Sequence, residues 1–168
     1  LHNSWGWCPY QPCKGYTDAD WAGIEDTRQS TAGLIFLFNG AAISWYSKTL
    51  RVIALSSQDA EYMALSDGSR EVIFVRQLLD KLIGFNMGPS EIIGDNNGSL
   101  AVANNPANHQ KTKHIQVRYH FVRQQIEDKV IVTIKAPTDL QLADVMTKAL
   151  VSNSHWKLIN LASGHTFG

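Results

Sequence analysis

The 168-residue sequence predicts an α/β fold in which helices flank a mixed β-sheet. Three strand-like segments joined by hairpin signals come first, and helical and strand-like segments alternate after them. Hairpins make neighbouring strands antiparallel, whereas a helix that connects two strands allows them to lie parallel. A chain of this length, with 44% hydrophobic residues, forms one domain and can bury a sizeable core.

The first half of the chain contains the hairpin segments. We expect a strand over residues 14–21 and a second over residues 32–38, a continuous apolar run that is typical of a central strand. Asn39 and Gly40 are a strong signal for a hairpin turn, and residues 42–47 supply the returning strand. These segments predict three consecutive antiparallel strands.

A long helix is expected after the hairpins. Ser56 or Ser57 can cap its first turn, and apolar residues then recur at helical spacing. Gly84 is expected to end the helix. The remaining elements follow in the order strand 91–95, short helix 98–104, basic helix 113–128, strand 130–135 and closing helix 139–150.

The sequence predicts one folded domain with a flanking segment on each side. Residues 1–13 have no sustained period and are expected to form an irregular arm, residues 14–150 form the domain, and residues 151–168 form a C-terminal extension. The extension has a short apolar patch that docks on the domain or frays. Cys8 and Cys13 are the only cysteines, which indicates free thiols in a reducing compartment.

Composition restricts the classes of partner. The 15 basic and 15 acidic residues balance, so attraction to a polyanion must come from a local patch. No apolar stretch approaches the roughly 20 residues that cross a bilayer, and the first residues lack the basic start and apolar centre of a signal peptide. We therefore expect an intracellular protein that is not secreted and has no membrane partner.

Four acidic residues stand where two-metal hydrolysis needs carboxylates. Asp18 lies in the first expected strand, Glu61 near the start of the long helix, Asp95 at the end of a later strand, and Asp144 in the closing helix. A cluster of carboxylates stays ionised only when cations neutralise it, so the four together predict a metal site. Two alternatives exist: any single acid can be a solvated surface group, and Asp144 can serve only the dipole of its helix.

Several motifs occur in one order without large gaps. They include residues 15–23 (GYTDADWAG), 26–33 (DTRQSTAG), 54–57 (ALSS), 60–64 (AEYMA), 112–115 (TKHI), 118–123 (RYHFVR) and 141–148 (QLADVMTK). With these motifs, the chain resembles the ribonuclease H domain of copia-type long-terminal-repeat retrotransposons over about residues 15–150.

This resemblance implies a ribonuclease H-like fold with a mixed five-stranded sheet flanked by helices. It implies an endoribonuclease that hydrolyses the RNA strand of an RNA/DNA hybrid with two Mg²⁺ ions, or with Mn²⁺ in their place. Carried over by position, Asp18 bridges both ions, Asp144 helps to hold the ion that activates water, and Glu61 and Asp95 hold the ion on the leaving-group side. A reverse transcriptase is expected in the parent polyprotein, in a cytoplasmic particle or the nucleus.

A basic stretch between Asn96 and Ile126 contains no acidic residue. Its Lys111, Lys113 and Arg118 are candidates for phosphate contacts to the hybrid, with an ordinary solvated helix face as the alternative. His114 is the candidate functional histidine, beside the scissile phosphate or the leaving group, and its alternative is a buried structural histidine. Nucleic-acid backbone contacts are also predicted for three capping-type residues, which can instead be simple helix caps: Ser56, Ser57 and Asn96.

Two other functions remain as alternatives to the ribonuclease. One is a retained non-catalytic module that binds nucleic acid or another protein. The other is an integrase-like DNA strand-transfer enzyme, which shares the fold and the carboxylate cluster. Such enzymes usually place their last carboxylate as a Glu on a late helix, whereas here Glu61 comes second and Asp144 last. This order favours the ribonuclease.

Overall fold

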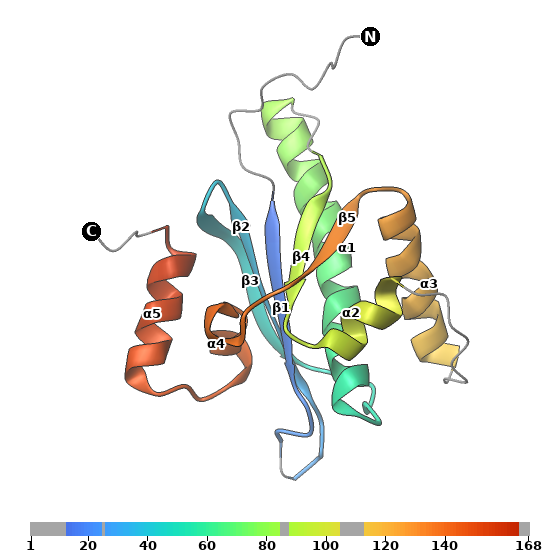
Figure 1. The fold of residues 1–168 in the computed structure, drawn as a ribbon, viewed down its shortest axis with the longest axis vertical. Coiled ribbons are helices and arrows are strands. Elements are labelled where there is room, and N and C mark those ends of the chain that lie inside the picture. Colours follow the sequence, from blue (N-terminus) through green and yellow to red (C-terminus); the bar gives the residue numbers. More distant parts are fainter. Residues whose placement is uncertain (1–12, 25, 85–87, 105–112, 165–168) are drawn as a thin grey trace.

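A five-stranded mixed sheet forms the centre of the protein, as the sequence predicts (Figure 1). The computed structural model describes residues 13–24, 26–84, 88–104 and 113–164. Cys8, Lys111 and the arm before Cys13 therefore lie outside the described residues. Among the described helices, none has the length and apolar character needed to cross a bilayer.

The strands are β1 (Lys14–Asp20), β2 (Thr31–Phe38), β3 (Ala41–Thr49), β4 (Ser90–Gly94) and β5 (Ile131–Lys135), in the spatial order β3-β2-β1-β4-β5. The first three are antiparallel, while β4 is parallel to both β1 and β5. The predicted hairpin turn is present at Asn39 and Gly40, which have φ values of 52° and 87°. Two consecutive positive φ values match the right-handed twist of the hairpin strands.

Helices cover the two faces of the sheet (Figure 1). On one face lie α1 (Ser57–Ile83), α2 (Asn97–Asn104) and α3 (Lys113–Glu127), and on the other lie the short α4 (Asp144–Thr147) and α5 (Ser152–Ala162). Ser56 caps α1 by accepting a hydrogen bond from the amide of Asp59, and Gly84 ends the helix in a left-handed conformation. The predicted start and end of this helix are therefore correct.

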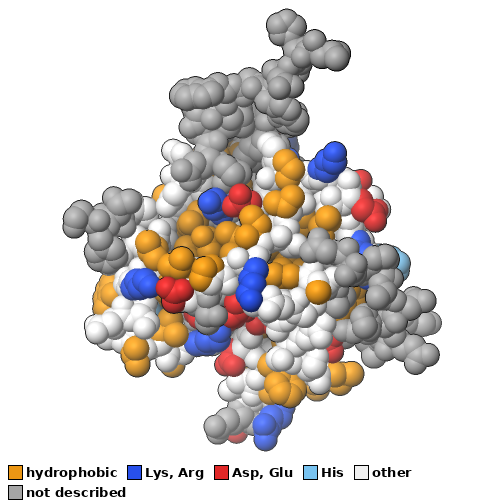
Figure 2. Space-filling view, viewed as in Figure 1, with side chains coloured by type: hydrophobic (Ala, Val, Ile, Leu, Met, Phe, Trp, Pro, Cys, Tyr) orange, Lys and Arg blue, Asp and Glu red, His pale blue; other side chains and the backbone are white. Residues whose placement is uncertain are grey.

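Two hydrophobic cores lie on opposite sides of the sheet because successive residues of a strand point to opposite faces. In β2, Leu34 and Phe36 pack under α1 and α3, whereas Ile35 and Leu37 pack against Leu158 of α5. Of the two alternatives for the C-terminal apolar patch, the structure shows docking. Beside α4 and α5, apolar side chains of β5 remain partly exposed on this face (Figure 2).

The prediction of one closing helix over residues 139–150 is wrong. The chain forms a 3-10 turn at Thr138–Leu140, then the four-residue α4, and the longer α5 follows it. The buried amide of Gln141 interrupts the helix, because its Nε2 donates to the carbonyl of Thr17 at 3.0 Å and its Oε1 accepts from the amide of Ala143 at 3.4 Å. These bonds fasten the segment to β1 instead of extending a helix.

α4 packs directly on β2, and Gly33 makes this approach possible. A β-carbon at position 33 would lie 2.7 Å from Met146 Cβ, 2.7 Å from Thr147 Cγ2 and 3.0 Å from the carbonyl of Ala143. These distances are well below van der Waals contact, so α4 would have to move away from the sheet.

We expect Gly33→Ala to lower the free energy of unfolding by about 1–3 kcal/mol, the usual range for overpacking. The matched control is Gly88→Ala, since a β-carbon there would meet no atom within 4 Å; its effect should stay within about 0.5 kcal/mol. Urea denaturation of both variants in chelator measures the difference. Equal stabilities would show that α4 does not rest on Gly33.

Candidate metal centre

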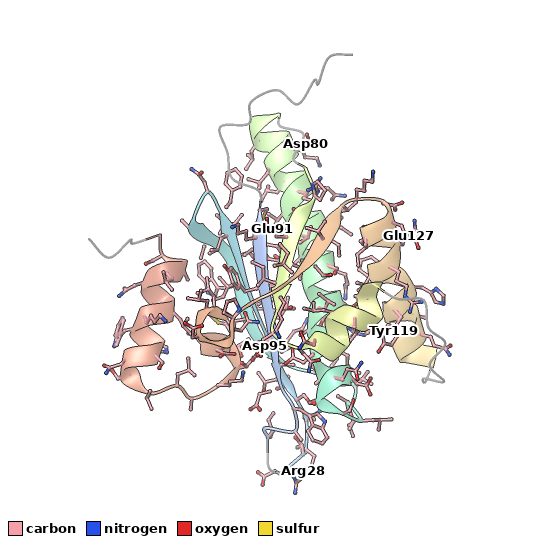
Figure 3. The ribbon with its side chains drawn as sticks, viewed as in Figure 1. Arg28, Asp80, Glu91, Asp95, Tyr119 and Glu127 are labelled. Carbon is pink, nitrogen blue, oxygen red and sulfur yellow. The ribbon has the colours of Figure 1, made fainter. Side chains whose placement is uncertain are left out.

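Three carboxylates from separate elements meet at one edge of the sheet. Asp18 lies in β1, Asp95 follows β4, and Glu61 lies in the second turn of α1. Because β1 and β4 are parallel neighbours, their carboxyl ends reach the same edge. One oxygen from each of these three side chains lies within 4.8 Å of the other two. Figure 3 shows Asp95 at this end of β4.

This geometry fits a magnesium ion. Two oxygens bound to one Mg²⁺ ion at about 2.1 Å are about 3.0 to 4.2 Å apart, so the three oxygens lie close to the spacing that one ion requires. Carboxylate oxygens are the hard ligands that Mg²⁺ and Mn²⁺ prefer. Asp18, Glu61 and Asp95 can therefore hold one divalent cation.

The crowding of negative charge also changes the pKa of Glu61. Burial, together with the charges of Asp18 and Asp95, raises the pKa of Glu61 to about 9, although a hydrogen bond from the backbone of Ala19 and the charge of Lys148 act in the opposite direction. At neutral pH and without a cation, Glu61 therefore holds a proton. A bound cation would displace it.

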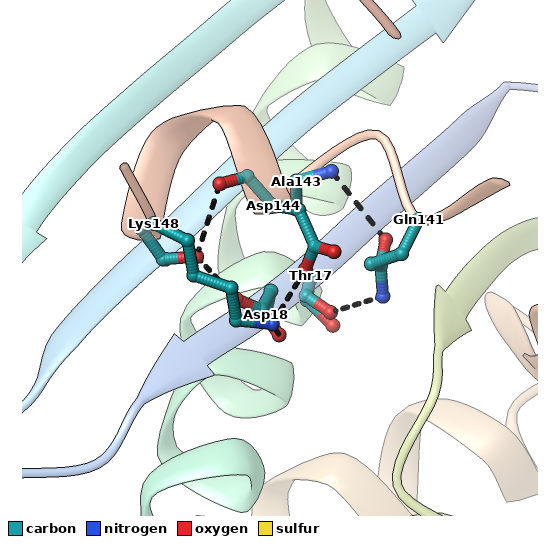
Figure 4. A network of polar contacts seen from close by, with 7 residues as sticks. Thr17, Asp18, Gln141, Ala143, Asp144 and Lys148 are labelled. Carbon is teal, nitrogen blue, oxygen red and sulfur yellow. Dashed lines mark hydrogen bonds and ion pairs between the residues drawn. The ribbon is translucent and has the colours of Figure 1, made fainter. Parts of the chain in front are cut away.

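Asp144 lies beside this trio and is joined to it by an ammonium group. Lys148 Nζ lies 2.7 Å from Asp144 Oδ1 and 3.2 Å from Asp18 Oδ1, so those two oxygens are no farther apart than the sum of the two distances (Figure 4). Burial raises the pKa of Asp144, and the charges of Asp18 and Asp95 add to that rise, while the hydrogen bond from Lys148 opposes it. Asp144 is thus placed beside the other three acids.

Asp18 is fully buried, and both of its oxygens have partners. Thr147 Oγ1 donates to Asp18 Oδ2, and Lys148 contacts Asp18 Oδ1. Burial alone would lower the pKa of Lys148, but its bond to Asp144 and the charge of Asp18 outweigh burial and raise that pKa above its ordinary value. The ammonium therefore remains charged at neutral pH.

Thr147 and Lys148 were not predicted as site residues. A signal for Lys148 was present, because it stands four positions after Asp144, a spacing at which opposite charges meet on a helix. No comparable local signal exists for Thr147, whose partner Asp18 is 129 positions away in the sequence.

The predicted nucleic-acid contacts fall into different environments. Ser56 caps α1, and Asn96 caps α2 by accepting from the amide of Ser99 at 3.0 Å. Ser57 is the exposed first residue of α1. Lys113 and His114 begin α3 with side chains outside the described part of the structure.

Arg118 is held by a buried carboxylate. Its Nη1 donates to Asp67 Oδ1 at 2.9 Å and to the carbonyl of Met63 at 3.3 Å. Lys48 also contacts Asp67, at 3.0 Å, and Arg70 approaches it at 3.9 Å. With Arg51, these side chains line a cavity of about 270 Å³ between the end of β3, α1 and α3. Four cationic side chains thus face one acidic side chain in this cavity, which we call the basic cavity.

No protein-family model matches the chain. The chain is 39% identical over 140 residues to the retrovirus-related Pol polyprotein from transposon TNT 1-94 of Nicotiana tabacum. The match covers 83% of this chain and 10% of the polyprotein, so the chain spans only about a tenth of that relative's length.

Solved structures share the fold. RNase H1 from the archaeon Halobacterium salinarum NRC-1 superposes with a TM-score of 0.60 at 14% identity, covering 88% of this chain and 98% of that one. LC11-RNase H1 in complex with RNA/DNA hybrid superposes with a TM-score of 0.60 at 16% identity, covering 80% of this chain and 93% of that one. At these identities the likeness establishes the fold.

The raised pKa of Glu61 predicts a pH-dependent stability in chelator. A carboxyl whose pKa is raised in the folded state contributes stability that is fully present below its unfolded pKa, near 4.5, and is lost as pH rises toward 9. Glu61→Gln removes this titration, so its unfolding free energy should exceed that of the wild type by at least about 1 kcal/mol at pH 8.5, since one pKa unit corresponds to about 1.4 kcal/mol.

Urea denaturation at pH 5.5 and 8.5 measures this effect as the difference between variant and wild type at each pH. Glu127→Gln, on an exposed position of α3, is the matched control, and the change with pH should be larger for Glu61→Gln than for this control. A Glu61→Gln difference that stays constant between the two pH values would contradict the proton on Glu61.

Proposed function

We propose that this chain, which belongs to the retrovirus-related Pol polyproteins and has the ribonuclease H-like fold, is an endoribonuclease that cleaves the RNA strand of RNA/DNA hybrids by two-metal-ion hydrolysis. The observation that supports this most strongly is the meeting of Asp18, Glu61 and Asp95 within 4.8 Å, with Asp144 beside them. Hydrolysis of a phosphodiester by two metal ions needs such a cluster of hard oxygen ligands.

The position of each carboxylate would decide which divalent cation it holds. Asp18, at the centre, would contact both divalent cations, with Glu61 and Asp95 on one side and Asp144 on the other. When bound, Mg²⁺ or Mn²⁺ ions supply an activated water and neutralise charge on the scissile phosphate. The chain itself holds these carboxylates at fixed separations, because β1, α1 and β4 form one packed unit. We further propose that His114, at the start of α3, acts at the scissile phosphate or at the leaving group.

An RNA/DNA hybrid is the proposed substrate. LC11-RNase H1, which shares the fold, has been solved with an RNA/DNA hybrid bound. The basic cavity supports a phosphate contact in this chain, because three of its four cationic residues are exposed: Lys48, Arg51 and Arg70. Such contacts to a nucleic-acid backbone are electrostatic and independent of base sequence.

The polyprotein relative supports a proposal about the cellular setting. We propose that the domain acts with a reverse transcriptase of the same polyprotein, in an intracellular particle or the nucleus of the host cell. During reverse transcription, removal of the RNA strand would follow synthesis of the DNA strand.

Asp95→Asn tests the proposed activity. Labelled RNA/DNA hybrid, duplex RNA and duplex DNA are incubated with wild type or variant in Mg²⁺, Mn²⁺ or chelator. We expect metal-dependent cutting of RNA in the hybrid alone, reduced by at least about 100-fold in Asp95→Asn, the order of loss seen when one group that stabilises transition-state charge is removed.

Asp80→Asn is the matched control, because Asp80 is exposed and lies at the opposite end of α1 from the metal centre (Figure 3). It should cut at the wild-type rate. Binding of the hybrid without cutting in either metal would instead support the non-catalytic binding module, and cutting or joining of duplex DNA would support the strand-transfer enzyme.

Arg51→Ala tests the basic cavity. In an Asp95→Asn background, which leaves the hybrid uncut, Arg51→Ala should weaken hybrid binding and reduce the slope of log Kd against log salt concentration by about 1. Fluorescence anisotropy between 50 and 200 mM salt measures this slope. Lys81→Ala, at an exposed position near the end of α1, should leave it unchanged; an unchanged slope in Arg51→Ala would exclude the cavity from the interface.

A further inference from the structure

The four predicted carboxylates are not equivalent in the structure. Asp18, Glu61 and Asp95 offer oxygens within 4.8 Å of one another, and Asp144 is outside this group. Between Asp18 and Asp144 lies the ammonium of Lys148, at 3.2 Å from one carboxylate and 2.7 Å from the other. Asp18 therefore belongs to two groups. With Glu61 and Asp95 it can hold a divalent cation, and with Asp144 it already holds the ammonium of Lys148.

The ammonium and a divalent ion compete for the same oxygens. A cation shared by Asp18 and Asp144 would need to approach their oxygens to about 2.1 Å, and Lys148 Nζ already lies against Oδ1 of both. Lys148 Nζ thus lies between the two carboxylates, where a second divalent ion would have to bind, whereas Glu61 and Asp95 approach Asp18 without an ammonium between them.

We propose that Lys148 serves as an internal cation that replaces one of the two divalent ions in the substrate-free domain. This inference rests on the proposed two-metal function. The free domain then takes up one ion, at Asp18, Glu61 and Asp95, and admits a second ion between Asp18 and Asp144 only when Lys148 moves away.

Lys148 is placed to make this movement. It is the C-terminal cap residue of α4, with an extended backbone at φ −123° and ψ 144°, and its side chain is 37% exposed. A four-carbon stem with a strongly hydrated end can rotate into solvent without moving the helix. The scissile phosphate of a bound strand would offer the displaced ammonium a new anionic partner, so arrival of the second ion would be coupled to arrival of substrate.

Counting bound ions in the absence of substrate tests the proposal. Mn²⁺ is titrated into the protein and free Mn²⁺ is followed by electron paramagnetic resonance. The wild type should bind one ion per chain with high affinity, and Lys148→Met should bind two. Lys148→Arg keeps the positive charge and should bind one. Lys157→Met is the control, since Lys157 pairs with Asp139 at 3.5 Å on the exposed surface; it should also bind one ion.

Two ions in the wild type, or one in a folded Lys148→Met, would overturn the proposal. A measurement on the wild type alone covers the case in which Lys148→Met does not fold: the side-chain ammonium signal of Lys148 in nuclear magnetic resonance spectra should persist through the first equivalent of Mg²⁺. Loss of that signal at the first equivalent would contradict the internal cation. Neither measurement uses a hybrid, so a protein that passes both and never cuts hybrid would contradict the proposed function alone.

Discussion

The site depends on how the protein tolerates negative charge from three acidic side chains at one edge of the sheet. Asp18 is fully buried in the central strand β1, and Glu61 and Asp95 point toward it from α1 and from the end of the parallel strand β4. An uncompensated cluster of this kind destabilises a fold, because buried charges lose their hydration and repel each other. The protein compensates with a proton on Glu61 and an ammonium from Lys148.

The C-terminal part of the chain supplies that ammonium and holds it in place. Gly33 allows α4 to rest on β2, and Gln141 ties the segment before α4 to the carbonyl of Thr17, the residue before Asp18. α5 then covers the neighbouring part of the sheet through Leu158 and Ala162. These contacts place Asp144 and Lys148 beside a carboxylate far away in sequence, so packing on this face and charge balance in the site are coupled.

Local patterns were sufficient to predict the strands, the long helix and the elements that position Asp18, Glu61 and Asp95. Apolar runs, a turn dipeptide and a helix cap are properties of neighbouring residues, and the three acids lie in those well-defined elements. The brevity of α4 could not be predicted, because it results from a bond between Gln141 and a backbone carbonyl 124 positions earlier. The pairing of Arg118 with the buried Asp67 is likewise tertiary, since 51 positions separate the two residues.

Both charged sites share one rigid element, and this relates them in space. Glu61 belongs to the candidate metal centre and Asp67 to the basic cavity, and both lie in α1, six positions apart. At a rise of about 1.5 Å per residue, they are separated by roughly 9 Å along the helix axis. The candidate metal centre has more acidic than basic side chains, whereas the basic cavity has more basic than acidic ones. Under the proposed function, a bound strand would place one phosphate beside divalent cations at the first site and another phosphate in the basic cavity. α1 would then set the distance between the two phosphates.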